Sequence, residues 1–328
     1  MNLILYSAVE TGDKASEDTL DQARFIAEEL SALGMSLSMI PVGGESKEPL
    51  KDFEELLKDM QPSFVFNLIE SWDGSDAHAW MPLEVLESLR IPYTGNRSFA
   101  FKRCADKEEL NKELISWGLN VPKPWDQEQS GLFLIKSAKE HASFGLHDEH
   151  IVESQHVKDV IAQQEKRYGS GFFAEKYIDG REFNISLFED EATSLVIFPP
   201  AEIDFSNYAD GKPKIVGHMA KWEKDCFEYF NSDRSFHFND FDKPLLEELK
   251  AISKKCWENL RLSGYARIDF RVDAKNKPFI IDINVNPCLS PDAGFLAAAK
   301  RAGLTPSQVF EKLIKNCKTA DPACRLPS

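Results

Sequence analysis

Two carboxylates, one amide and one guanidinium occupy alternating positions on two consecutive strand-like segments near the end of the chain. In order, they are Arg267, Asp269, Asp282 and Asn284. If the segments pair symmetrically about Lys275 and Asn276, Asp269 lies opposite Asp282 and all four side chains point to one face. Like charges directly opposite each other repel. Because carboxylate and amide oxygens are the ligands that Mg²⁺ prefers, the pattern favours a magnesium site.

The residues that alternate with this polar set are apolar, and we expect them to face the core. They are Ile268, Phe270, Ile281 and Ile283. The alternative is an ordinary hairpin with a solvated polar face. That polar face has fewer lysines and threonines than an ordinary solvent-exposed sheet face would have, and the dipeptide Asn286-Pro287 follows it. Together these features favour the metal site.

A lysine followed by small residues indicates a second kind of site, one that binds phosphate. Lys136 ends the apolar strand pattern 132–136, and the small residues of 137–145 come next. Backbone N–H groups in such a loop are able to approach phosphate oxygens. The G-x-x-x-x-G-K-[ST] phosphate motif is absent. A solvated lysine at a strand end is the alternative.

Two glutamates flank the connection between two further strand patterns. Glu175 lies near the end of the first apolar run, and Glu182 begins the next. A glutamate placed like Glu175 is able to accept a hydrogen bond from an adenine amino group, and one placed like Glu182 to bind ribose hydroxyls. A charged surface turn is the alternative.

The first hundred residues alternate between strand and helix patterns, which predicts a parallel α/β domain. Strands are predicted over 2–6, 37–42 and 64–68, helices over 19–33, 49–59 and 81–89, and a strand or turn over 91–95. Later elements are helices over 107–117, 245–262 and 303–315, and strands over 132–136, 172–177, 182–188, 265–272 and 278–284. Residues 204–240 have weak periodicity and are predicted to form a long functional loop.

Composition narrows the function classes. The 328 residues carry a net charge of -15 with a pI of about 5.0, so we expect no nucleic acid and no anionic membrane as a partner. The six cysteines form no C-x-x-C pair, which predicts reduced thiols in a cytosol. The first residues lack a basic region and a long apolar run, so we expect no signal peptide and a cytoplasmic location.

In order and spacing, these segments resemble the D-alanine–D-alanine ligase branch of the ATP-grasp superfamily over about residues 1–315. The similar segments are Val65-Phe66-Asn67-Leu68, Ile91-Pro92-Tyr93-Thr94-Gly95, Asp106-Lys107 with Val121-Pro122, Leu134-Ile135-Lys136, Ala174-Glu175-Lys176-Tyr177, Gly180-Arg181-Glu182-Phe183, Arg267-Ile268-Asp269, and Asp282-Ile283-Asn284 with Asn286-Pro287. Each motif is weak alone, and their order together is specific.

The resemblance implies an α/β fold, α+β in its ATP-grasp part. A Rossmann-like parallel N-terminal domain over 1–100 would precede two ATP-grasp subdomains that sandwich the nucleotide, 101–182 and 183–316, and a tail over 317–328. The resemblance also implies ATP and two Mg²⁺ ions as cofactors, with Mn²⁺ as the alternative ion, and a homodimer formed through the first domain.

The resemblance implies a role for each matching residue. Lys107, Lys136 and, when the long loop closes, Lys221 would bind the ATP phosphates, and Ser143 would belong to the phosphate loop. Glu175, Lys176 and Tyr177 would form the adenine hinge, and Glu182 would bind the ribose. Asp269, Asp282 and Asn284 would hold the metal ions, and Arg267 would stabilise the oxyanion of the tetrahedral intermediate. Arg267 and Lys221 are therefore the predicted catalytic residues.

The sequence departs from the family pattern where the substrates are chosen. The predicted substrate residues are Glu10 or Glu17 for the first amino group, Glu70 in place of a histidine, Trp222 in place of a tyrosine, and Asn286, Cys288 and Asp292 in the segment after the metal ligands. We therefore predict a substrate pair other than two D-alanines, and the negative charge of Glu70 and Asp292 suits a cationic or amine-bearing substrate.

The predicted function is an ATP-dependent carboxylate–amine ligase that forms an amide or dipeptide bond through an acyl phosphate, with small carboxylates and amines as substrates. The loop over 204–240 would close over this labile intermediate. A small-molecule kinase on the same scaffold is one alternative, and it would release ADP without an added amine. A non-catalytic nucleotide-binding protein is the other, and it would tolerate loss of the metal ligands.

Overall fold

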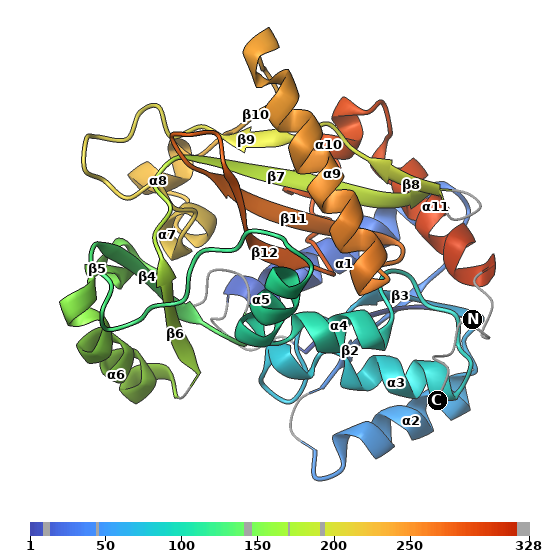
Figure 1. Cartoon of the computed structure of the whole chain (residues 1–328). Helices are drawn as coiled ribbons and strands as arrows, with labels where there is room; N and C mark the ends of the chain where they lie inside the picture. Colours follow the sequence, from blue (N-terminus) through green and yellow to red (C-terminus); the bar gives the residue numbers. More distant parts are fainter. Residues whose placement is uncertain (9–13, 44–45, 141–145, 170, 191–193, 320–328) are drawn as a thin grey trace.

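The computed structural model describes residues 1–8, 14–43, 46–140, 146–169, 171–190 and 194–319, and within them the chain forms three sheets flanked by helices (Figure 1). The first sheet is parallel, in the order β2-β1-β3, with β1 at Asn2–Ser7, β2 at Ser38–Val42 and β3 at Phe64–Leu68. Its flanking helices are α1 (Lys14–Ala32), α2 (Pro49–Met60) and α3 (Met81–Ser88). The predicted parallel α/β segment is confirmed.

The second sheet is antiparallel, in the order β5-β4-β6, with β4 at Leu132–Ser137, β5 at Ile151–Glu153 and β6 at Phe172–Lys176. One face packs against α6 (Val157–Tyr168) through Phe133, Ile135 and Val157. Because side chains alternate across a strand, Lys136 falls on the opposite face. Ahead of this sheet lie α4 (Ser98–Cys104) and α5 (Lys107–Ser116). The Asp106 side chain caps α5 by accepting from two backbone N–H groups.

The third sheet is antiparallel, in the order β10-β9-β7-β11-β12, and β8 also pairs with β7. Its strands are β7 (Arg181–Asp190), β8 (Ser194–Ile197), β9 (Ala201–Ile203), β10 (Arg234–Ser235), β11 (Tyr265–Val272) and β12 (Pro278–Asn284). The helix α9 (Lys243–Leu260) crosses one face of it (Figure 1). That face is apolar and includes Phe183 and Ile268, so the alternating polar residues face the other way.

The hairpin of β11 and β12 has the predicted register at the polar positions, with Asp269 opposite Asp282 and Arg267 opposite Asn284. Nearer the turn the register shifts by one residue, because Phe270 pairs with Ile280. Ile281 is therefore the extra residue of a β-bulge. The prediction that Ile281 faces the core is wrong: the bulge leaves its side chain half-buried at a cavity, whereas Ile268, Phe270 and Ile283 are buried as predicted.

The segment between the first sheet and α4 is fixed to the start of β11. The Asn96 amide donates to Tyr265 O (2.6 Å) and Val285 O (2.8 Å). Gly264 has a φ of +66°, and a Cβ there would lie 2.7 Å from the Cα of Gly95. Only glycine fits such a close approach, so this contact sets where β11 begins.

Two predictions about irregular segments change. The predicted loop over 204–240 contains the short helices α7 (His218–Trp222) and α8 (Phe227–Phe230) as well as β10. The helix α10 (Gly294–Arg301) precedes α11 (Pro306–Thr319), and α11 extends three residues into the predicted tail. The predicted domain boundaries remain a prediction, and the one at residue 182 falls inside β7.

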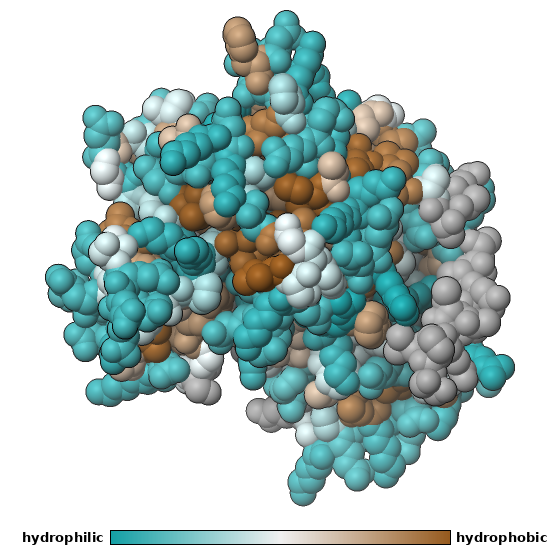
Figure 2. Space-filling view, in the orientation of Figure 1, coloured by the Kyte–Doolittle hydropathy of each residue, from teal (hydrophilic) through white to brown (hydrophobic). Residues whose placement is uncertain are grey.

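Hydrophilic side chains dominate the face seen in Figure 2, and hydrophobic atoms show mainly near its centre. Among the described residues, no helix combines the length and apolar character needed to cross a membrane.

Candidate active site

Residues from all three sheets line one cavity of about 580 Å³. Its walls are the polar face of the third sheet, the face of the second sheet that points away from α6, and the ends of the first-sheet strands with the start of α1. Carboxylates, lysines and arginines from segments far apart in the sequence therefore meet here.

The third sheet presents Arg267, Asp269 and Asn184 to the cavity from neighbouring strands. Arg267 donates to both carboxylate oxygens of Asp269, from Nε and Nη2 at 2.8 Å each. The Asn184 amide donates to Asp269 Oδ1 at 2.8 Å. Although burial opposes it, the Asp269 carboxylate raises the pKa of Arg267 above its ordinary value. Arg267 is therefore a permanent positive charge beside the predicted metal ligand.

Asp282 and Asn284 lie next to this pair on β12. Lys107 Nζ lies 3.9 Å from Asp282 Oδ1, and Asn284 Oδ1 accepts from the backbone N–H of Asn286 at 2.9 Å. Within the part of the chain that the structure describes, no three His, Cys, Asp or Glu side chains form a metal-binding group. The hard oxygen donors Asp269, Asp282 and Asn284 suit Mg²⁺, which commonly takes few protein carboxylates together with phosphate oxygens.

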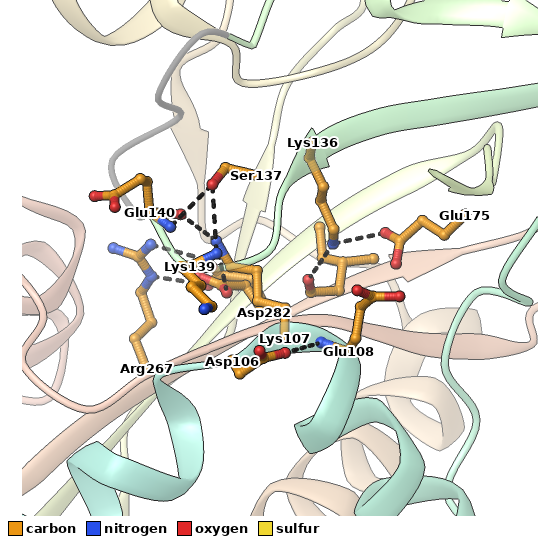
Figure 3. Close-up of polar contacts among 12 residues, drawn as sticks. Asp106, Lys107, Glu108, Lys136, Ser137, Lys139, Glu140, Glu175, Arg267 and Asp282 are labelled. Atoms are coloured by element: carbon orange, nitrogen blue, oxygen red, sulfur yellow. Dashed lines mark hydrogen bonds and ion pairs between the residues drawn. The ribbon is translucent and has the colours of Figure 1, made fainter. Parts of the chain in front are cut away.

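Two lysines, Lys107 and Lys136, lie in the same part of the cavity as Asp282 (Figure 3). Lys136 Nζ lies 2.6 Å from Glu175 Oε1 and donates to Ile281 O at 3.0 Å, so it spans from β4 to the bulge on β12. Lys107 Nζ donates to Glu140 O at 2.6 Å. Burial lowers the pKa of Lys107, and the nearby Asp282 carboxylate opposes that shift. Both ammonium groups therefore lie in the same cavity as the predicted metal ligands.

Lys221, on α7, brings a third ammonium group to the cavity. Its pKa is lowered, first by burial and then by the positive charge of Arg267, while Asp269 and Asp282 act in the opposite direction. An anion bound between these cations would reverse that effect. The cavity therefore concentrates positive charge where a phosphate group would be favoured.

The predicted adenine and ribose residues lie at one end of the cavity. Glu175 is 2% exposed, and its pKa is raised by burial although Lys136 opposes the shift. Glu182 pairs with Arg271 at 3.2 Å. Tyr177 lines the same end. Lys176 also lines it, although its ammonium group donates to Ser130 O at 3.0 Å and lies over the Phe133 ring, which faces α6.

The opposite end of the cavity is acidic. Asp18, on α1, accepts hydrogen bonds from Cys288 Sγ and Ser290 Oγ at 3.3 Å each. The Gln22 amide donates to Glu70 Oε1, also at 3.3 Å. Burial raises the pKa of Glu70 to about 8, and the negative charges of Asp18 and Asp76 add to the shift. The carboxylates of Asp18 and Glu70 therefore lie near each other in a site that is partly shielded from solvent.

The remaining predicted substrate residues divide into three groups. Trp222, Cys288 and Asp292 line the cavity, as does Asn286, whose side-chain oxygen accepts from the Tyr265 hydroxyl at 2.6 Å. Glu17 is exposed and does not line it. Glu10 lies outside the described residues, as does Ser143, the residue predicted for the phosphate loop.

The sequence interpretation did not single out four residues that shape the cavity: Asp18, Gln22, Asn184 and Arg271. Asn184 and Arg271 each lie two residues from a predicted site residue on the same strand. The period-two rule therefore already placed them on the polar face. Asp18 and Gln22 lie one turn apart on α1 and had no such signal.

Comparison with known proteins finds relatives of the whole chain. The sequence family described as "D-ala D-ala ligase C-terminus" matches residues 126–315. The D-alanine–D-alanine ligase of Aquifex aeolicus is 26% identical over 323 residues, covering 92% of this chain and 96% of that protein. Two solved structures share the fold. The D-alanine–D-alanine ligase of Bacillus anthracis complexed with ATP has a TM-score of 0.70 and 19% identity, with 97% of each chain covered. The VanG D-Ala:D-Ser ligase of Enterococcus faecalis has a TM-score of 0.68 and 16% identity, with 96% and 98% covered.

Proposed function

Because the chain belongs to the D-alanine–D-alanine ligase family of ATP-grasp enzymes, we propose that it joins a small carboxylic acid to an amine. We further propose that this substrate pair is not two D-alanines. Members of this family are ATP-dependent ligases that form carbon–nitrogen bonds and release ADP. The observation that carries the proposal is one cavity that brings three lysines and Arg267 together with Asp269, Asp282 and Asn284.

In the first step the carboxylate of one substrate attacks the γ-phosphorus of ATP, which gives an acyl phosphate and ADP. Lys107, Lys136 and Lys221 bind and orient the phosphate oxygens and offset their negative charge. Asp269, Asp282 and Asn284 would hold the divalent ions. When bound, Mg²⁺ supplies charge neutralisation at the phosphates.

In the second step the amine attacks the acyl carbon and phosphate leaves. The guanidinium of Arg267 is held in place by its two hydrogen bonds to Asp269. It therefore offers a preorganised positive charge to the oxyanion that develops on the carbonyl. The segment that carries Lys221 and Trp222 covers the reacting centre and limits hydrolysis of the acyl phosphate.

The acidic end of the cavity supports the choice of substrate. Asp18 and Glu70 face the same space with no basic side chain hydrogen-bonded to either among the described residues. A substrate amine or a cationic side chain would offset their mutual repulsion. We therefore propose an amino acid or related amine-bearing acid as the first substrate.

Three further parts of the proposal follow the family resemblance: the use of two Mg²⁺ ions, Mn²⁺ as the alternative ion, and a homodimer formed through residues 1–100. A cytoplasmic location is proposed from the cysteine pattern.

The test is ADP release from Mg²⁺-ATP, screened with amino acids of both configurations, diamino acids and simple amines, singly and in pairs. A product mass equal to two substrates less one water is the expected result. Lys136→Ala and Asp282→Ala should abolish it, while Lys112→Ala, which removes an exposed lysine paired only with Glu109, should not. A phosphorylated substrate without an amide product would replace the ligase proposal with a kinase.

A further inference from the structure

Arg271 is a buried arginine that three separate segments hold in place at the nucleotide end of the cavity. Its Nε donates to Ile178 O at 3.0 Å, in the connection between β6 and β7. Its Nη1 donates to Lys214 O at 2.6 Å and to Glu182 Oε2 at 3.2 Å. Because these contacts come from different segments, the plane of the guanidinium is fixed before any ligand binds.

Aromatic rings limit its movement further. The Arg271 Cζ lies 5.7 Å from the centroid of the Tyr177 ring and 6.0 Å from that of the Phe205 ring. Arg271 and Glu182 are also direct cross-strand neighbours on β11 and β7. The guanidinium and the carboxylate are therefore presented side by side on the polar face of the sheet.

Among the residues that the structure describes, none bonds to the third nitrogen of this guanidinium, Nη2. Arg271 is 4% exposed and lines the cavity, and within the described parts of the chain its Nη2 makes no hydrogen bond. Glu175 Oε2 is in the same situation, in the same cavity. A buried donor and a buried acceptor without partners are costly in an empty site. Their presence indicates groups that a ligand completes.

The chemistry of the Arg271–Glu182 pair points to a hydroxyl. A hydroxyl is both a donor and an acceptor, so a carboxylate satisfies its proton while a guanidinium donates to its oxygen. Nucleotide phosphates would be repelled by Glu182, and an apolar group would leave Nη2 unpaired. The ribose of a nucleotide offers two adjacent hydroxyls of this kind.

We propose that Arg271 Nη2 donates a hydrogen bond to a ribose hydroxyl of the bound nucleotide, and that the Arg271–Glu182 pair selects ribonucleotides over their deoxy analogues. This inference rests on the ATP binding that belongs to the proposed function. It adds a specificity-determining residue to the sugar site, whereas the sequence resemblance pointed to Glu182 alone.

The test measures dissociation constants of Mg²⁺-ATP, Mg²⁺-2′-deoxy-ATP and Mg²⁺-3′-deoxy-ATP by calorimetry, with no other substrate present. The unmodified protein should bind ATP about tenfold or more tightly than at least one deoxy analogue, since a charge-assisted hydrogen bond is lost. In Arg271→Met that preference should fall at least fivefold. Arg181→Met is the matched control, because Arg181 pairs with Glu202 and Asp242 and does not line the cavity, and it should keep the preference.

Equal weakening of all three nucleotides in Arg271→Met would overturn the inference, since Arg271 would then only support the fold. Absence of any preference in the unmodified protein would also overturn it. If Arg271→Met does not fold, Arg271→Lys keeps the charge but replaces the three guanidinium nitrogens with a single ammonium nitrogen, and it should likewise lose the preference. Failure of every nucleotide to bind would instead refute the proposed function, whereas nucleotide discrimination without amide formation would leave this inference standing.

Discussion

Glu70 makes the stability of the protein depend on pH in a direction opposite to that of a carboxylate paired with a cation. Burial raises its pKa from 4.5 to about 8, so the folded protein keeps a proton that the unfolded chain releases between these values. The free energy of unfolding therefore falls as the pH rises from about 4.5 to about 8, and is level beyond. The difference between these two pKa values corresponds to about 5 kcal/mol, at about 1.36 kcal/mol for each tenfold change in proton affinity. This is an upper limit, because the side chain is only half-buried.

Glu70→Gln removes the titrating proton and keeps a similar shape beside Gln22. We expect the variant to match the unmodified protein near pH 4.5 and to be more stable by several kcal/mol, up to about 5, at pH 9. Urea unfolding at pH 5, 7 and 9, without ligands, measures the difference. Glu17→Gln, an exposed carboxylate on the same helix as Gln22, is the control and should change stability by less than about 0.5 kcal/mol throughout. A Glu70→Gln effect that is the same at pH 5 and pH 9 would refute the reasoning.

Three further predictions concern the neighbouring contacts. Lys136→Met leaves Glu175 as a buried carboxylate without its counter-ion, so the free energy of unfolding should fall by about 3–5 kcal/mol. Adding Glu175→Gln should restore most of the lost stability. If urea unfolding showed no restoration, the pairing of Lys136 with Glu175 would be contradicted. Gly264→Ala places a Cβ 2.7 Å from the Gly95 Cα at a φ of +66° and should cost about 1–3 kcal/mol; an unchanged melting temperature would show that the approach relaxes freely. Asp282→Asn should lower Mg²⁺-dependent ADP release by about 10- to 100-fold at limiting Mg²⁺, and an unchanged Mg²⁺ titration would exclude Asp282 as a ligand.

The strands that carry the chemistry were predictable because their alternation is regular. The bounds of β11 and β12 match the prediction, since polar and apolar residues alternate cleanly over both. Five helices were not predicted: α4, α6, α7, α8 and α10. α6 has a polar sequence with only a narrow apolar stripe, and α10 follows a segment that contains two prolines, Pro287 and Pro291. Short helices like these are stabilised by the surfaces they pack against, which local sequence does not reveal.

The site itself was predictable where one strand or hairpin supplies it, and not where distant segments meet. Asp18 meets Cys288 and Ser290 across about 270 residues of sequence, a contact that no local pattern indicates. Glu17, one of the two residues predicted to bind the first amino group, lies one position away. One position on a helix turns a side chain by about 100°, enough to take it from the cavity to the solvent.

Because of the bulge at Ile281, the number of residues between the turn and Asp282 determines whether the predicted metal ligands lie opposite each other. Between the turn and the bulge, β11 and β12 pair in one register, and beyond the bulge they pair in another that sets Asp269 opposite Asp282. Deleting one residue of β12 between the turn and the ligands would move every later side chain to the other face of the sheet. If the turn gained one residue and the bulge lost one, the ligands would stay in place. Among natural variants of this hairpin, insertions and deletions should therefore occur in matched pairs, and an unmatched one would displace the proposed metal ligands.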